Sequence, residues 1–375
     1  MAWSRRELLA ALPAVRQSGR APVLITDPPD GAILNRHDGT AVAAGLEIAV
    51  RGECPEGTPV RVNGRPARVR GGTFEARAVL AGHENRIEVR SGREASGITV
   101  LWDRHSFPRY RVSTDDNIWF LRDLAQNAGR RQSIFENPYL ALWREMHHKY
   151  GAKVHFNIYY ETGGFNLSQM PDAYRAEWRQ NRDWIRLTFH ARANDPDRPY
   201  KHAAAGQIRG DYRLVTAEIE RFAGRELLSP VTTVHWGETT REGALALRRE
   251  GIRIMLGYFQ LRDGAPQVSY YLDAPRARFL SGRDYWKDTG TDIIFIRHDL
   301  VLNTLPLEKI VPRLEEIAAD PHQSEILELM IHEQYFYPHY RAYQPDYRQK
   351  IESALAWVTR KGYKPVFYAD GFLGA

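Results

Sequence analysis

The sequence predicts a multidomain protein in which an all-β sandwich is followed by a β/α barrel. The first reason is length, because 375 residues exceed what one ordinary hydrophobic core holds. The second is a change of pattern: short alternating runs separated by turns give way to strand-like runs that alternate with helical periodicity. We therefore expect an N-terminal segment at residues 1–21, a sandwich at residues 22–104 and a barrel at residues 105–375.

Composition and charge exclude several classes of protein. With 43% hydrophobic and 26% charged residues the chain is typical of a globular protein, and no apolar run is long enough for a transmembrane anchor. The net charge of +6 comes from interleaved arginine and acidic residues, so we expect no nucleic-acid partner. The single cysteine, Cys54, excludes an intrachain disulfide and a cysteine-rich metal site. The sequence does not indicate an oligomeric state.

The N-terminal segment resembles a degenerate twin-arginine export signal. Ser4-Arg5-Arg6-Glu7 is followed by a short apolar stretch that Arg16 interrupts. A functional signal would make the protein periplasmic or secreted, and otherwise it is cytoplasmic. A ragged N-terminal helix is the alternative interpretation.

Residues 22–102 carry the sandwich prediction. Five alternating runs lie at residues 46–51, 60–63, 73–80, 85–90 and 97–102, with turn residues between them. Such regularly spaced short strands are typical of a β-sandwich. The Val60-Arg-Val-Asn-Gly64 strand and turn, Phe74 and the Asn85-Arg-Ile-Glu-Val89 strand resemble bacterial Ig-like modules attached to carbohydrate enzymes. That resemblance implies a sugar-binding or positioning role, and a structural spacer is the alternative.

From residue 109 onward strand-like and helical runs alternate. The strand-like runs lie at residues 110–114, 153–160, 184–190, 231–235, 252–258, 292–297, 326–332 and 364–368. The helical runs lie at residues 137–150, 172–182, 212–223, 239–249, 307–319 and 346–360. Repeated βα units predict a parallel sheet with crossover helices, and seven or eight of them favour a barrel. No strand is followed by Gly-x-Gly-x-x-Gly, so a nucleotide-binding doubly wound fold is not expected.

Histidines and acids fall at the ends of the predicted strands. In a β/α barrel the active site lies at the carboxyl ends of the strands. Four of the 13 histidines lie at or just beyond such an end. The residues at these positions are Asp115, Asp116, Glu161, His190, His235, Glu238, His298, Asp299, His332 and Glu333. A structural role explains one such histidine more readily than four, so we expect an active site at this rim.

Asp115 and Asp116 are the first of these residues. Adjacent carboxylates repel, which makes one proton hard to remove, and a bound cation relieves the repulsion. One carboxylate can then ligate the metal while the other moves protons. We therefore interpret the pair as the base of a metal-dependent, sugar-processing site. The alternative is an exposed Asp-Asp pair that caps a helix beginning near Ile118.

Three stretches resemble the NodB-homology polysaccharide deacetylases, the family-four carbohydrate esterases. Ser113-Thr-Asp115-Asp116 stands where that family has Thr-Phe-Asp-Asp at the end of the first barrel strand. Leu187-Thr-Phe-His190 followed by Asn194 matches the first histidine of the family's His-Ser-x-x-His motif. Leu327-Glu-Leu-Met-Ile-His332 fits the late strand that ends in a histidine. His235-Trp236-Gly237 stands in the place of an Arg-x-Pro-aromatic motif and does not match it.

The resemblance implies a distorted seven-stranded barrel in a divergent branch of this family. It implies that Asp115 is the general base, that Asp116 binds a divalent metal, with zinc expected, and that His332 is the general acid. The implied reaction removes N- or O-acetyl groups from a polysaccharide or oligosaccharide. The carbohydrate is therefore the expected partner.

The remaining roles also follow from the resemblance and from the strand ends. His190 is the expected second ligand. The third is Asn194, which is a weaker ligand for zinc, or a rim histidine such as His235 or His298. The residues expected to contact the sugar are Trp236, Tyr160, Tyr335, Arg297 and His298. Plain barrel packing is the alternative for the aromatic ones.

Two other enzyme classes and a binding protein stay open. Glu238 and Glu333 follow strands at the places where many retaining glycosidases carry their catalytic carboxylates. A uronate lyase or epimerase could use the same rim, with Arg297 holding a carboxylate. The third alternative is a non-catalytic carbohydrate-binding protein on a degenerate barrel, which the Asn194 departure favours.

Overall fold

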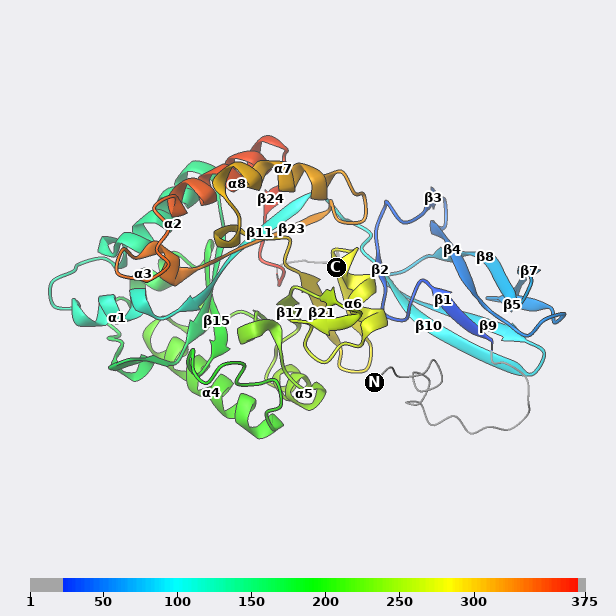
Figure 1. Cartoon of the computed structure of the whole chain (residues 1–375), viewed down its shortest axis with the longest axis horizontal. Helices are drawn as coiled ribbons and strands as arrows, with labels where there is room; N and C mark the ends of the chain where they lie inside the picture. Colours follow the sequence, from blue (N-terminus) through cyan, green and yellow to red (C-terminus); the bar gives the residue numbers. More distant parts are fainter. Residues whose placement is uncertain (1–22, 370–375) are drawn as a thin grey trace.

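The structure, a computed structural model, describes residues 23–369 of the chain (Figure 1). The export signal expected at residues 1–21 lies outside the described residues. An N-terminal all-β part and a larger mixed α/β part lie end to end in Figure 1. None of the helices in residues 23–369 has the length and hydrophobicity needed to cross a lipid bilayer.

The N-terminal part consists of two five-stranded sheets. One has the order β1-β4-β8-β7, with β3 paired to β4, and the other has the order β2-β10-β9-β5-β6. The strands are β1 (Leu24–Asp27), β2 (Ile33–Leu34), β3 (Thr40–Val42), β4 (Gly45–Glu53), β5 (Val60–Val62), β6 (Arg65–Pro66), β7 (Arg68–Arg70), β8 (Thr73–Leu80), β9 (Glu84–Ser91) and β10 (Glu94–Trp102). Alternate residues of β4, namely Leu46, Ile48 and Val50, are buried in a core that both sheets share. The Ig-like character of this part stays a prediction.

The α/β part contains a six-stranded and a four-stranded sheet. The first has the order β15-β12-β11-β23-β22, with β24 also paired to β11, and the second has the order β16-β17-β21-β20. The strands are β11 (Arg109–Asn117), β12 (Val154–Tyr159), β15 (Ile185–Ala191), β16 (Val231–Thr232), β17 (Ile254–Gly257), β20 (Tyr285–Asp288), β21 (Ile293–Arg297), β22 (Leu300–Val301), β23 (Ile326–His332) and β24 (Lys364–Pro365). Two hairpins lie outside these sheets: β13 (Glu161–Thr162) with β14 (Phe165–Asn166), and β18 (Gln260–Arg262) with β19 (Ala265–Gln267).

The two sheets of the α/β part adjoin at two places. Ahead of β16, the Ser229 N–H donates to the Leu187 carbonyl of β15, at 3.2 Å. Beyond β21, the Asp299 N–H donates to the Glu328 carbonyl of β23, at 3.1 Å. The strand pairings are parallel except for β20 with β21. This mixed α/β arrangement, in which two separate sheets meet at these two places, is compatible with the predicted β/α barrel.

Helices cover the outside of the sheets. In Figure 1, α2, α7 and α8 lie along one side and α4 and α5 along the opposite side. The helices are α1 (Trp119–Gln126), α2 (Pro138–Tyr150), α3 (Arg175–Gln180), α4 (Ala205–Phe222), α5 (Arg241–Arg249), α6 (Ala274–Ser281), α7 (Leu307–Ala318) and α8 (Tyr347–Arg360). The 3-10 turns are η2 (Ile134–Glu136), η3 (Leu167–Gln169), η4 (Arg225–Leu227), η5 (His235–Gly237), η6 (Leu302–Thr304) and η7 (Glu333–Phe336). α2 shows both boundary signals, because the Asn137 side chain caps its start and left-handed Gly151 ends it.

Some predicted elements differ from the observed ones. The run at residues 231–235 is a strand only at its first two residues and then turns into η5, where Trp236 has a φ of 65°. The helix predicted at residues 212–223 begins earlier, at Ala205. Its first turns contain two glycines and expose most side chains, so they carry little apolar periodicity.

The register of β11 on β23 places the rim residues. Arg111 lies beside Glu328, and two residues later on each strand Ser113 lies beside Met330. One more step of two brings Asp115 beside His332 at the carboxyl ends. Because side chains alternate along a strand, these residues share one face of the sheet. The intervening Val112, Leu329 and Ile331 join the hydrophobic core with the covering helices.

The N-terminal part packs against the α/β part through a buried interface. Ile33 and Leu101 join a cluster with Ile254, Ile296 and other apolar residues of the larger sheets. Buried polar groups accompany them, and the residues are Arg109, Asp103, Tyr285 and Asn35. The two parts are therefore joined by more than their linker.

Candidate metal centre

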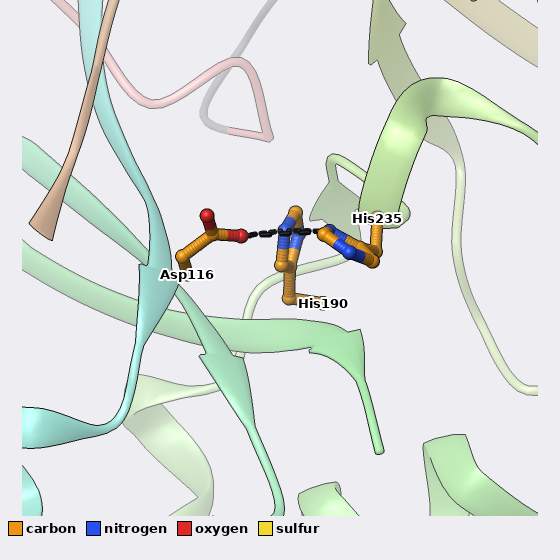
Figure 2. Close-up of side chains that lie close together, drawn as sticks. All are labelled: Asp116, His190 and His235. Carbon is orange, nitrogen blue, oxygen red and sulfur yellow. Dashed lines mark hydrogen bonds and ion pairs between the residues drawn. The ribbon is translucent and has the colours of Figure 1, made fainter. Parts of the chain in front are cut away.

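Three side chains from separate elements converge in the α/β part (Figure 2). Asp116 is the last residue but one of β11, His190 is the last residue but one of β15, and His235 begins η5. Their ligand atoms lie within 4.8 Å of one another. His190 Nε2 is 3.1 Å from Asp116 Oδ1, and His235 Nδ1 is 3.2 Å from His190 Nε2 and 3.4 Å from Asp116 Oδ1. We call these three residues the triad.

A local backbone feature turns both acids toward the same cavity. Along a regular strand Asp115 and Asp116 would point to opposite faces. Asp116 instead has a φ of 62°, and the pairing of β11 with β12 shifts register between Thr114 and Asn117. Both carboxylates therefore line one cavity. A non-glycine residue with positive φ is strained, which is common at functional sites.

The hydrogen bonds of His190 fix which of its ring nitrogens faces Asp116. His190 Nδ1 lies 2.5 Å from the Thr233 carbonyl, which can only accept, so Nδ1 carries the proton. Burial lowers the pKa of His190, which favours the neutral ring. The Nε2 lone pair of the neutral ring then faces Asp116 Oδ1, another acceptor, at 3.1 Å. Two facing acceptors repel unless a proton or a metal ion lies between them.

The surroundings of the Asp116 carboxylate favour its charged form. Tyr159 donates to its Oδ1 at 2.5 Å and Gln334 Nε2 donates to its Oδ2 at 2.7 Å. Burial raises the pKa of Asp116, but the neighbouring His190, His235 and His332 outweigh burial and hold the pKa well below its usual range.

The triad fits a divalent metal such as zinc. Two imidazoles and a carboxylate are a common three-residue set of catalytic zinc sites, which keep a further position for substrate. Ligand atoms ~2.1 Å from a tetrahedral ion lie roughly 3.4 Å apart. The three distances in the triad, 3.1, 3.2 and 3.4 Å, match that spacing. Of the three candidates predicted for the third ligand, Asn194, His235 and His298, it is His235 whose ring nitrogens lie beside Asp116 and His190.

Asp115 lies beside the triad as a buried carboxyl group. Asn157 Nδ2 donates to Asp115 Oδ1 at 2.6 Å. Burial and the neighbouring Asp116 raise the pKa of Asp115 well above its usual value. The two adjacent acids therefore have pKa values displaced in opposite directions, a pattern that occurs where two titratable groups of an active site have different roles.

His332 lies beside Asp115 with one ring nitrogen fixed. Asn303 Oδ1 accepts from the His332 backbone N–H at 3.1 Å, so this atom is the amide oxygen. The same oxygen is 3.0 Å from His332 Nδ1, which must therefore carry a proton. The other ring nitrogen of His332, Nε2, is therefore the one that can exchange a proton. Burial lowers the pKa of His332.

A cavity of about 490 Å³ connects these groups. Nine residues that the sequence nominated line it: Asp115, Asp116, His190, Asn194, His235, Trp236, His298, His332 and Tyr335. A second cavity of about 560 Å³ shares Asp116, Asn194 and Gln334 with the first. Trp236 is 42% exposed at the rim, so its ring is open to a ligand.

Four residues with a predicted role at the site do not line this cavity, and neither do Glu161 and Asp299 from the predicted strand ends. Glu333 is fully buried and accepts from the N–H groups of Ile118, Trp119 and Phe120, at 2.6 to 2.9 Å. It therefore caps α1, the role that the alternative interpretation gave to the Asp115–Asp116 pair.

The other three nominated residues face elsewhere. Glu238 lines a different pocket and lies 3.5 Å from Arg198. Arg297 is buried and is bound to Asp299 and the Ser281 carbonyl. Tyr160 follows Tyr159, and it is Tyr159 that reaches the triad.

Below the triad the sheet interior is polar. Arg111 and Glu328 form a fully buried ion pair at 2.5 Å, and Arg111 Nε also donates to His155 Nδ1 at 2.7 Å. Ser113 and Tyr368 donate to the same Glu328 carboxylate. These contacts connect β11, β12 and β23 beneath the carboxylate pair and fix the strands that carry it.

Sequence reasoning missed Tyr159, Asn157, Asn303 and Gln334. A period of two along residues 153–160 puts Asn157 and Tyr159 on one face, which could have selected Tyr159 in place of Tyr160. Asn303 lies in η6 and Gln334 in η7, outside the strands, where the sequence has no comparable signal.

Comparisons with known proteins give distant structural likenesses. No protein-family model matches the chain, and no curated protein matches it. The chain is similar to a CE4 family pseudoenzyme from Bacillus anthracis, at 9% identity and a TM-score of 0.33, over 70% of this chain and 64% of the other. It is similar to a CE4 esterase from Streptococcus mutans, at 10% identity and a TM-score of 0.35, over 69% and 85%. It is also similar to a 4-alpha-glucanotransferase from Thermococcus litoralis, at 12% identity and a TM-score of 0.48, over 72% and 40%.

Proposed function

We propose that the protein is a metal-dependent hydrolase that removes N- or O-acetyl groups from a polysaccharide or oligosaccharide. The observation that carries this proposal is that the triad shares one cavity with two further titratable groups. These groups are the carboxyl group of Asp115 and the imidazole of His332. The motif resemblance around Asp115, His190 and His332 supports the same reaction.

The triad would hold the ion, with zinc as the expected metal. A bound divalent ion polarises the acyl carbonyl and makes a water more acidic. Asp116 and the two imidazoles supply its ligands, and Gln334 and Tyr159 orient the Asp116 carboxylate. His235 supplies the third donor, so the loss of the family's second histidine at Asn194 does not leave the site short of ligands.

Asp115 and His332 would move the protons. Asp115, held by Asn157, accepts the proton of the attacking water. His332 Nε2 delivers a proton to the leaving nitrogen or oxygen of the sugar, while Asn303 holds the other ring nitrogen. Trp236, Tyr335 and His298 line the cavity and would contact the sugar.

The glycosidase alternative has weaker support. Retaining glycosidases need two carboxyl groups ~5 Å apart across one bond. Glu333 is occupied by the start of α1, and Glu238 lines a separate pocket. For the uronate alternative, Arg297 lies away from the cavity and already binds Asp299.

Metal content and product analysis test the proposal. Purified protein loaded with zinc should release acetate from acetylated amino-sugar oligomers and create no new reducing ends. Removal of the metal with a chelator should stop the release. New reducing ends without acetate would indicate a glycosidase, and sugar binding without either product would indicate a binding protein; both outcomes contradict the proposal.

Mutation should distinguish the roles of the two adjacent carboxylates, Asp115 and Asp116. Asp116→Ala should abolish zinc binding, because it removes one of three ligands. Asp115→Asn should keep the zinc and lower kcat by about 10² to 10⁴. Zinc content by mass spectrometry and acetate release by enzymatic assay measure the two effects. Loss of zinc in Asp115→Asn with retention in Asp116→Ala would reverse the assigned roles.

A further inference from the structure

Glu238 lies at a pocket next to the candidate metal centre. This pocket has a volume of about 390 Å³, and we call it the Glu238 pocket. Val268 lines both this pocket and the cavity of the triad. Trp236 lines the cavity, and Glu238, two residues later along the chain, lines the pocket. The cavity and the Glu238 pocket are therefore neighbours.

Two buried polar side chains of the Glu238 pocket have unpartnered atoms. Glu238 is 8% exposed, and its Oε1 lies 3.5 Å from a nitrogen of Arg198. Its Oε2 has no hydrogen-bond partner among the described residues, and neither has the buried hydroxyl of the next residue, Thr239. Burying a polar atom without a partner is costly, so each such atom calls for an explanation. A ligand that bonds both groups supplies one for two adjacent residues in one pocket.

The charges around the Glu238 pocket indicate the class of ligand. Lys201 and Arg241 are exposed residues that line it, and they disfavour a cationic ligand. Glu238, the only acid among the described residues that line the pocket, disfavours an anionic group beside it. A neutral molecule with several hydroxyls avoids both conflicts, because hydroxyls can donate to a carboxylate and accept from lysine or arginine.

Two tyrosine rings also line the Glu238 pocket. The Tyr270 hydroxyl donates to the Leu256 carbonyl at 2.6 Å, and the Tyr271 hydroxyl donates to Asp288 Oδ2 at 2.5 Å. Because these hydroxyls are already bonded, the two residues offer mainly ring surface to a ligand. Ring surface beside hydrogen-bonding groups suits a sugar, which has apolar C–H groups on its faces and hydroxyls at its edge.

We propose that the Glu238 pocket binds a distal sugar unit of the oligosaccharide whose acylated unit occupies the cavity of the triad. Glu238 accepts from the hydroxyls of that unit, and Tyr270 and Tyr271 contact its ring. Arg198 connects the two spaces, because it lies 5.0 Å over the Trp236 ring and also contacts Glu238. The inference rests on the carbohydrate ligand of the proposed function but not on its reaction. It adds that the ligand is a chain of several sugar units.

Binding of saccharides of two lengths tests this inference. The probes are the disaccharide and the hexasaccharide of N-acetylglucosamine, titrated by calorimetry into full-length, zinc-loaded protein, or into its Asp115→Asn variant where the wild type releases acetate. The hexasaccharide should bind about ten-fold more tightly than the disaccharide. Glu238→Ala should remove most of this advantage, because hydrogen bonds to a charged group are lost, and should leave disaccharide binding unchanged. Glu242→Gln, at an exposed glutamate in the first turn of α5, is the control and should change neither affinity.

Each other outcome counts against the inference. Equal affinity for the two saccharides in the wild type would overturn it. An equal loss for both lengths in Glu238→Ala would also overturn it, because Glu238 would then act on the cavity through Arg198. If Glu238→Ala does not fold, Lys201→Ala decides, because it removes only an exposed donor and should weaken hexasaccharide binding alone, by about three-fold. Unchanged hexasaccharide binding in Lys201→Ala would then overturn the inference.

The inference and the proposed function can fail separately. Length-dependent binding that needs Glu238, without acetate release, would keep the inference and refute the proposed function. Acetate release with the same KM for both saccharides would keep the proposed function and refute the inference. If neither saccharide binds, both are refuted.

Discussion

Asp116 combines a strained backbone with a charged side chain. Its positive φ costs about 1–3 kcal/mol for a non-glycine residue, and its neighbour Asp115 adds charge repulsion. The surrounding donors, Tyr159 and Gln334, stabilise the carboxylate in return. A residue placed at such cost suggests a functional constraint, and the proposed metal would supply it for this pair.

Asn303 fixes the tautomer of His332, which yields a prediction for the proposed reaction. Asn303→Ala removes the acceptor of the Nδ1 proton, so the ring loses its orientation and its free Nε2. We expect kcat for acetate release to fall by about 10- to 100-fold, a part of the ~10²–10⁴ that a positioned acid contributes. Zinc content should not change, because Asn303 does not contact the triad.

A conservative change provides the control for this prediction. Asn303→Asp keeps an acceptor oxygen at the same place and should retain more kcat than Asn303→Ala. Equal kcat in Asn303→Ala and the wild-type protein would show that His332 does not act through a fixed tautomer.

The sequence predicted individual site residues unevenly. Asp115, Asp116, His190, His235 and His332 follow strands that buried apolar runs identify, and the structure brings them together. The position of His235, rather than Asn194, beside Asp116 and His190 depends on how the chain turns into η5, which no local pattern predicts. Tyr160 was predicted at the site, but Tyr159 contacts the triad. An error of one residue in a strand assigns each side chain to the opposite face of the sheet.

At the scale of elements, the start of α1 depends on a residue far away in sequence. Ile118, its N-cap residue, offers no side-chain oxygen, so the first three N–H groups bind the Glu333 carboxylate that follows β23. Helix starts leave such donors unsatisfied, and burying them without an acceptor is costly. Glu333 thus connects two elements that both adjoin the candidate metal centre.

Replacement of Glu333 should lower stability. Glu333→Ala leaves three buried N–H groups without an acceptor, so we expect the free energy of unfolding to fall by about 2–3 kcal/mol. Urea denaturation measures this change. Glu308→Ala, at an exposed glutamate in the first turn of α7, is the control and should change stability by less than about 0.5 kcal/mol. A Glu333→Ala protein of unchanged stability that has lost all turnover would instead support a catalytic role.

The elements themselves were largely predictable from periodicity. β23 matches its predicted bounds, and β12, β15 and α2 agree within one residue at each end, because buried strands and capped helices leave strong patterns. The short helix α6 and the antiparallel strand β20 were not predicted. Both are brief, and their burial depends on tertiary packing rather than on a periodic face.

At the scale of the whole molecule, the interface between the two parts could not be read from the sequence. Ile33 and Leu101 look like ordinary core residues of the N-terminal sheets, yet they pack against Ile254 and Ile296. Apolar periodicity shows that a residue is buried but not which surface covers it. The same holds for Asp103 and Arg109, whose pairing depends on how the linker places the two parts.

This interface should make the two parts unfold together. Asp103 and Arg109 form a buried ion pair at 2.5 Å, and the Tyr285 hydroxyl donates to the same carboxylate at 2.9 Å. Asp103→Ala removes the carboxylate from a buried guanidinium, which typically costs about 3–5 kcal/mol. Calorimetry should show one transition in the wild-type protein and a lower midpoint, or a split into two transitions, in the variant. Asp27→Ala, in an exposed pair with Arg51, should cost less than about 1 kcal/mol. Two separate transitions in the wild-type protein would mean that the parts are stable independently and that the buried contacts do not couple them.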